Sequence, residues 1–231
     1  MYRLGKYTER DNMSELISEN YRVLSVLSRF GIALGVGDKT IGEVCGESNV
    51  DAKTFLTVVN MLLDEDGSLD KDSYEFSLKS LMTYLHNAHE YFLGYRLPSI
   101  RTELEAALED KNSNLARAIL NYFDEYVAEV QSHMMYEENT VFPYVRALTG
   151  DGRPVDYSID IFRERHDKVE SRLSEFKNIL IKYYSAKNTN EINNVLFDIF
   201  NCEHDLASHN EIEDRLFVPA IAELENKKRK K

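Results

Sequence analysis

The chain has 231 residues, 43% of them apolar and 29% charged, a composition typical of a folded globular protein rather than of a disordered chain. Its formal net charge of −12 at pH 7 argues against nucleic acid as a main partner, because binding phosphates requires a basic face. With no Trp, four Pro and ten Gly among long runs rich in Leu, Glu, Ala and Lys, the sequence predicts an all-α fold rather than an all-β one.

The first part of the chain, residues 1–70, predicts a small helical domain. A first helix is expected over Met13–Phe30, a second begins with Thr40 as its N-cap, and a third begins after Asp51 as its N-cap. Helices joined by short turns also occur in DNA-reading motifs. Twelve Asp and Glu against seven Lys and Arg in this region argue against that interpretation. The acidic segment 64–70 is interpreted as a linker to the rest of the chain.

The N-terminus and the cysteines indicate the compartment. The first residues contain no apolar segment of the kind found in signal peptides, and no run of about 18 apolar residues occurs anywhere. Cys45 and Cys202 lie far apart in the sequence and have no metal-ligand spacing. We therefore expect a cytoplasmic protein that does not enter a membrane, with both thiols buried and inert.

Residues 74–226 predict four long helices separated by turn-rich segments at 110–114, 149–154 and 186–190. Long helices with short connections favour an up-down-up-down four-helix bundle. The sequence therefore predicts this bundle preceded by the small N-terminal helical domain. The expected helices are Tyr74–Glu109, Leu115–Leu148, Ser158–Tyr184 and Glu191–Glu225.

All six histidines lie in these four helices, with at least one on each helix. In an antiparallel bundle the middles of the helices lie at similar depth, so that one histidine from each helix can converge on one point. Four of the six have a glutamate four residues later, a spacing that directs both side chains to the same side of a helix. Each helix thus presents an imidazole and a carboxylate, as a metal site requires. The four pairs are His86/Glu90, His133/Glu137, His166/Glu170 and His209/Glu213, and the other histidines are His89 and His204.

The second and fourth helices share a longer pattern, H-x3-E-x5-P. It occurs once with Glu137 and Pro143 and again with Glu213 and Pro219. A repeat of this kind is expected if the two halves of a bundle play equivalent roles.

These residues carry a resemblance to a known family. The segment Ser132–Pro143 resembles the SHMxxEExxxFP motif of hemerythrin-like, or HHE cation-binding, domains, and within them the chain resembles bacterial proteins that repair iron–sulfur centres. Leu85–His89 with the following Leu97-Pro98 resembles the first-ligand motif, Arg165–Asp167 the third and Ser208–Glu213 the fourth. Over residues 74–225 the resemblance implies four terminal histidine ligands and two bridging glutamates. The ligands so implied are His86, His133, His166, His209, Glu137 and Glu213.

The resemblance implies two iron ions joined by an oxo bridge, and manganese or a mixed pair remains an alternative. Six ligands that mix imidazole with carboxylate suit two octahedral ions better than one tetrahedral zinc. His89 is expected to orient a ligand or to relay a proton, and His204 to lie at the rim. Whether Glu90 and Glu170 also reach the metal stays open.

The N-terminal region resembles the accessory domain of the repair proteins, but it lacks their adjacent cysteine pair. That pair would fall at Gly35 and Val36, so thiol-mediated iron delivery is in doubt here.

The resemblance implies a non-haem di-iron protein of nitrosative or oxidative stress. Such a protein binds NO, O2 or peroxide and supports the repair of iron–sulfur client proteins. Two alternatives remain: an O2- or NO-binding sensor or carrier, and a di-iron peroxidase. The chain shows neither an output domain for a sensor nor a redox thiol pair for a peroxidase. The sequence indicates no oligomeric state.

Overall fold

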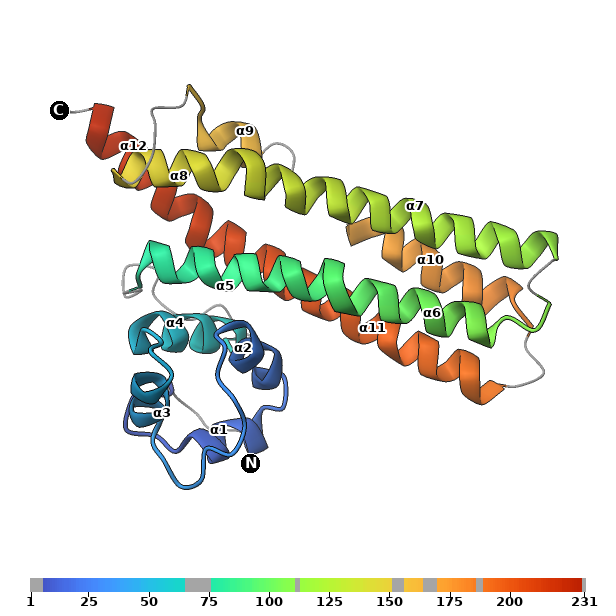
Figure 1. The fold of residues 1–231 in the computed structure, drawn as a ribbon, viewed down its shortest axis with the longest axis horizontal. Coiled ribbons are helices and arrows are strands. Elements are labelled where there is room, and N and C mark those ends of the chain that lie inside the picture. Colours follow the sequence, from blue (N-terminus) through green and yellow to red (C-terminus); the bar gives the residue numbers. More distant parts are fainter. Residues whose placement is uncertain are drawn as a thin grey trace. The chain divides into compact units, whose positions relative to one another are not determined.

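The computed structural model describes residues 6–64, 76–110, 113–150, 156–163, 170–185 and 189–229 (Figure 1). In these ranges the fold is all-α as predicted, and the one β-type contact is an isolated antiparallel bridge between Asn12 and Thr40. The chain divides into two compact units, Met1–Ala88 and His89–Lys231. The division falls within helix α5 (Leu78–Tyr91), later in the chain than the boundary expected near residue 70. Most of the linker proposed at 64–70 lies outside the described residues.

Both helix starts predicted in the first unit are confirmed. Thr40 forms a capping box, in which its hydroxyl accepts from the backbone N–H of Glu43 and the Glu43 carboxylate accepts from the backbone N–H of Thr40 at 2.8 Å. The Asp51 carboxylate accepts from the backbone N–H of Thr54 at 2.8 Å. The helices of this unit before α5 are α1 (Met13–Glu19), α2 (Val23–Arg29), α3 (Ile41–Glu47) and α4 (Ala52–Leu62).

The single helix predicted over Met13–Phe30 is wrong, because the chain leaves the helical conformation at Asn20. This residue has φ −140° and ψ 79°, and its side-chain amide donates to the Tyr7 hydroxyl at 3.0 Å. An Asn side chain that bonds outside its own helix competes with the helical backbone pattern. After α2 the chain turns at Gly31, whose φ of +71° is a conformation that favours glycine.

The beginning of α5 packs into the core of the first unit. The Phe30 ring lies 5.5 Å from the ring of Phe55 on α4 and 4.8 Å from that of Tyr84 on α5. The side-chain amide of Asn87 donates to the backbone carbonyl of Arg29 at 2.7 Å. Burying a large apolar side chain contributes about 1.5–3 kcal/mol. These contacts therefore account for the assignment of residues up to Ala88 to this unit.

The second unit is built from long antiparallel rods (Figure 1). Helix α6 contacts α7 and α11, and α10 contacts the same two helices, which closes a ring of four. This arrangement agrees with the predicted bundle. Of the predicted third helix the structure describes α9 and α10, and residues 164–169 between them lie outside the described part. The helices of this unit after α5 are α6 (Leu97–Ala107), α7 (Asn114–Tyr136), α8 (Phe142–Thr149), α9 (Ile159–Arg163), α10 (Glu170–Tyr183), α11 (Thr189–Ile212) and α12 (Val218–Arg229).

One buried stripe of α7 forms much of the bundle core. Its members recur every three or four residues, as expected for the core face of an amphipathic helix. The Phe123 ring lies 5.4 Å from the ring of Phe176 on α10, which joins α7 to α10. The stripe consists of Ala116, Ile119, Phe123, Tyr126, Val130 and Met134.

In the described part of the chain, three rods each contain one π turn, and each of these turns ends just before an X-Pro pair. The turns are η2 (Phe92–Arg96), η3 (Glu137–Val141) and η5 (Glu213–Phe217). Each turn closes with a backbone hydrogen bond between residues five positions apart, for example from the N–H of Phe142 to the carbonyl of Glu137. The following proline lacks an N–H, and its ring would clash with the carbonyl four residues earlier in a regular α-helix. The wider turn relieves that clash without ending the rod.

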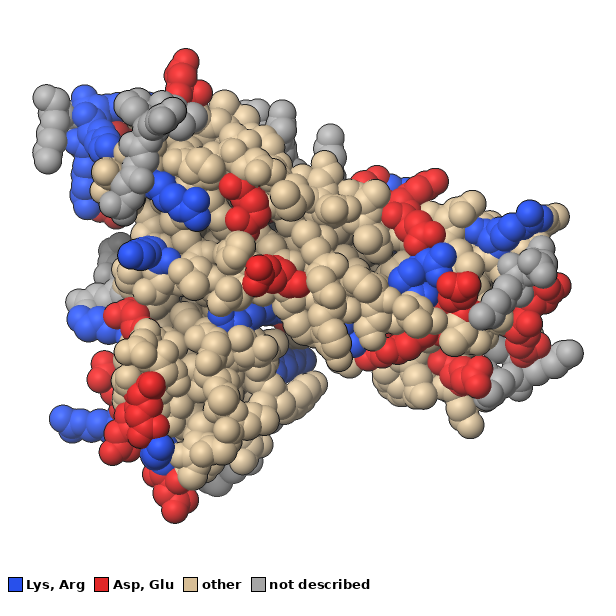
Figure 2. Space-filling model, in the orientation of Figure 1, with Lys and Arg blue, Asp and Glu red and all other residues tan. Residues whose placement is uncertain are grey.

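Acidic and basic side chains are interspersed over the face drawn in Figure 2, so the net charge of −12 is not gathered into one acidic surface there. Among the described helices, none combines the length and the apolar character that a membrane span requires.

Candidate metal centre

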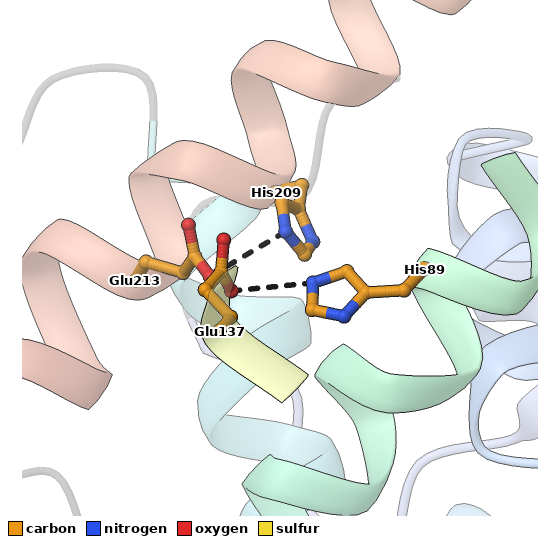
Figure 3. A group of neighbouring side chains, drawn as sticks. All are labelled: His89, Glu137, His209 and Glu213. Atoms are coloured by element: carbon orange, nitrogen blue, oxygen red, sulfur yellow. Dashed lines mark ion pairs between the residues drawn. The ribbon is translucent and has the colours of Figure 1, made fainter. Parts of the chain in front are cut away.

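Four buried side chains from three rods meet inside the second unit (Figure 3). They come from α5, η3, α11 and η5. One ligand atom of each lies within 4.8 Å of those of the others, a spacing that can hold a metal ion. The side chains of this group, called here the buried His/Glu group, are His89, Glu137, His209 and Glu213.

Glu137 lies between two histidines. Its Oε1 is 3.0 Å from Nε2 of His133, one turn earlier on the same rod, and its Oε2 is 3.2 Å from Nε2 of His89 on α5. Each oxygen of one carboxylate therefore faces a different imidazole. His133 is 13% exposed at its side chain, whereas the Glu137 side chain is fully buried.

His209 and Glu213 repeat this arrangement on the fourth rod. Glu213 Oε1 lies 3.5 Å from Nε2 of His209, and both side chains are fully buried. The rings of His209 and His89 meet edge to face at 5.1 Å, so that the two halves adjoin. The spacing H-x3-E thus places an imidazole and a carboxylate together on both rods, as the sequence predicted.

The buried carboxylates are electrostatically costly without a cation. Burial, and then the neighbouring Glu213 carboxylate, raise the pKa of Glu137 well above its ordinary value. Among the residues that the structure describes, neither carboxylate oxygen of Glu137 has a hydrogen-bond partner, and Nε2 of His89 has none either. Buried charges are normally paired or bound to metal, and unsatisfied polar atoms are rare. The oxygens of Glu137 and Nε2 of His89 are thus acceptor atoms that face one another, an arrangement that a bound metal cation would satisfy.

Aromatic rings enclose the group. Phe142 stacks on His89 at 5.7 Å with an interplanar angle of 9°, and Phe92 meets His209 edge-on at 6.0 Å. The ring of Phe162, on α9, stacks near His133 at 6.2 Å. Such walls lower the local dielectric constant and exclude water, which strengthens the attraction between carboxylates and a cation.

Comparison with protein-family models confirms the resemblance to HHE cation-binding domains. The model described as the hemerythrin HHE cation-binding domain matches residues 80–221, more than half of the chain. The chain belongs to this family. HHE domains bind metal cations, and the buried His/Glu group of this hemerythrin domain can hold them. A search of curated proteins found no match.

The hemerythrin domain does not bring every predicted ligand to the group. Of the six, Glu137, His209 and Glu213 belong to the group and His133 adjoins it. His86 is exposed and is not part of it, and His89 one turn later is buried there instead. The reason is the amphipathicity of α5. On α5, His86 shares the exposed stripe with Lys79, Thr83 and Glu90. His89 shares the buried stripe with Leu85, and Phe92 at the start of η2 continues it.

The remaining predictions concern residues at the margin of the group. His166, and the side chain of Glu170, lie outside the described residues, so that their roles stay predictions. Glu90 is exposed and does not belong to the group. His204 is exposed, as expected of a residue at the rim. His89, expected from the sequence to orient a ligand or to relay a proton, belongs to the group itself, and its apolar neighbours on α5 are visible in the sequence.

Proposed function

We propose that this hemerythrin domain holds two iron ions and binds a small oxidant or diatomic ligand: NO, O2 or peroxide. The observation that carries the proposal is the position of Glu137, whose two oxygens face different histidines. A carboxylate placed in this way can bridge two ions, whereas a mononuclear site has no need of an imidazole on each side. Carboxylate bridges between helices are typical of dinuclear centres in helical bundles.

The proposed ligand set divides around that bridge. One ion would be held on the side of His133, and the other on the side of His89 and His209, with Glu213 as the second carboxylate. This set replaces His86 by His89 and keeps the other predicted ligands, including His166. Mixed imidazole and carboxylate donors favour iron over zinc, and manganese or a mixed pair is the alternative that metal analysis will distinguish.

Iron, when bound, supplies the affinity for NO, O2 or peroxide and the change of oxidation state that their binding uses. The residues of the chain provide the environment. Glu137 and Glu213 offset the charge of the cations inside a buried site. The rings of Phe92 and Phe142 exclude water around the histidines, so that a small apolar ligand does not have to compete with bulk solvent there.

Within this chemistry we propose a cytoplasmic role in nitrosative or oxidative stress, in which the protein supports the repair of iron–sulfur client proteins. The resemblance of both regions of the chain to the repair proteins supports this role. The missing cysteine pair at Gly35 and Val36 means that any transfer of iron would not use thiols at that position. A sensor or carrier of NO or O2 and a di-iron peroxidase are the alternatives.

The test is to load the full chain with iron, reduce it without oxygen, and titrate it separately with NO, O2 and hydrogen peroxide while recording the visible spectrum. We expect a saturable spectral change with at least one of the three. Restoration of a metal-free iron–sulfur protein would favour repair, a stable reversible complex would favour a sensor or carrier, and sustained peroxide consumption with an electron donor would favour a peroxidase. No change with any ligand would contradict the proposal.

A further inference from the structure

An acidic residue outside the buried His/Glu group contacts one of its histidines. Glu138 follows Glu137 in η3, and its Oε1 lies 2.8 Å from Nδ1 of His89. The His89 side chain is 3% exposed and that of Glu138 is 20% exposed. A partly solvated carboxylate thus holds the outer nitrogen of a buried imidazole, whose other nitrogen points into the group.

This contact determines which nitrogen of His89 carries the proton. An ionised carboxylate only accepts hydrogen bonds, so Nδ1 of His89 must donate. In a neutral imidazole the lone pair then lies on Nε2, which is 3.2 Å from Glu137 Oε2 and has no hydrogen-bond partner among the described residues. Nε2 is therefore left free to bind a cation.

The same contact holds the orientation of the ring. Phe142 stacks on the face of His89 and restricts its tilt. The hydrogen bond to Glu138 holds one edge of the His89 ring, and it therefore opposes both rotation of the ring within its own plane and a 180° flip of the ring. A carboxylate bonded to the outer nitrogen also makes the imidazole a stronger electron donor.

We propose that Glu138 is the positioning residue of His89: it fixes the Nδ1–H tautomer and directs Nε2 to the metal. The inference rests on the proposed function for the identity of the metal, but the tautomer of His89 can be tested without metal. Glu223 on α12 provides a control, because it is an exposed glutamate that pairs with Lys227 one turn later.

The first experiment compares Glu138→Ala, Glu138→Gln and Glu223→Gln in the full chain, with iron affinity measured by competition with a chelator. Carboxylates that orient metal-bound histidines typically contribute about 10- to 100-fold in metal affinity. We expect a loss of that size in Glu138→Ala, and a smaller loss in Glu138→Gln, whose amide oxygen can still accept from Nδ1. Glu223→Gln should bind iron as the wild type does. Unchanged affinity in Glu138→Ala would overturn the inference.

The second experiment uses metal-free protein labelled with 15N-histidine, in which the His89 signals are identified by their absence from His89→Gln. We expect the His89 proton on Nδ1 in the wild type and on Nε2 in Glu138→Ala. A proton on Nε2 in the wild type would overturn the inference. If the wild type binds no iron, the proposed function fails, and this spectrum still decides the role of Glu138.

Discussion

Replacing Glu137 by Gln removes the charge of the proposed bridge while keeping its size. In the wild type one oxygen faces His133 at 3.0 Å and the other faces His89 at 3.2 Å. Gln presents a single oxygen and an NH2 group, which cannot bind a cation. Removing one partner of a buried charge pair costs about 3–5 kcal/mol, which corresponds to about two to three and a half orders of magnitude in affinity. Because the two oxygens of Glu137 face different histidines, we expect the affinity for both ions to fall together.

The assay is dialysis against a series of chelator-buffered iron concentrations, followed by elemental analysis of the protein. A matched control is Glu223→Gln, which changes an exposed glutamate paired with Lys227 on α12 and should leave the binding curve unchanged. The bridging interpretation would be refuted if Glu137→Gln kept one ion per chain at wild-type affinity. That result would place the carboxylate on one ion only.

Three further predictions follow from the placement of particular residues. His89→Ala should lower iron affinity at least about tenfold, whereas His86→Ala should leave it unchanged. Chelator competition measures both affinities, and a loss in His86→Ala alone would restore the assignment made from the sequence. A truncated chain that begins at residue 72 should keep its iron but melt at a lower temperature, because Tyr84 loses the Phe30 ring 4.8 Å away; loss of iron from a folded truncation would contradict this. Cys45 is fully buried and burial raises its pKa to about 12, so iodoacetamide at pH 8 should modify it only after unfolding, and rapid labelling of the folded protein would argue otherwise.

The helical architecture was largely predictable because local signals agreed with the tertiary structure. Thr40 and Asp51 cap helices as their sequence context predicts, and the segments at 110–114 and 149–154 separate long rods. The break at Asn20 was missed because it depends on a bond to Tyr7, a contact that helical periodicity does not report. The π turns were missed for a different reason. An X-Pro pair predicts that a helix ends or bends, and the sequence does not distinguish a wider turn from a break.

The candidate site was predictable on two rods because a histidine and a glutamate four residues apart, with a proline six residues after the glutamate, form one local unit. That unit places His133 with Glu137 and His209 with Glu213. On α5 the same spacing instead places His86 and Glu90 together on the exposed stripe of the helix. The spacing of a histidine and a glutamate does not specify which face of the helix carries them. The apolar neighbours of His89 carry that information.

The central claim is that the chain holds a pair of iron ions at Glu137. Its most direct test is the ratio of metal to protein in the full chain purified in air, recorded with the near-ultraviolet and visible spectrum. We predict about two iron ions per chain and the near-ultraviolet absorption of an oxo-bridged pair, as in other dinuclear centres of helical bundles. One metal ion per chain, or a stoichiometric content of zinc with no such absorption, would contradict the account.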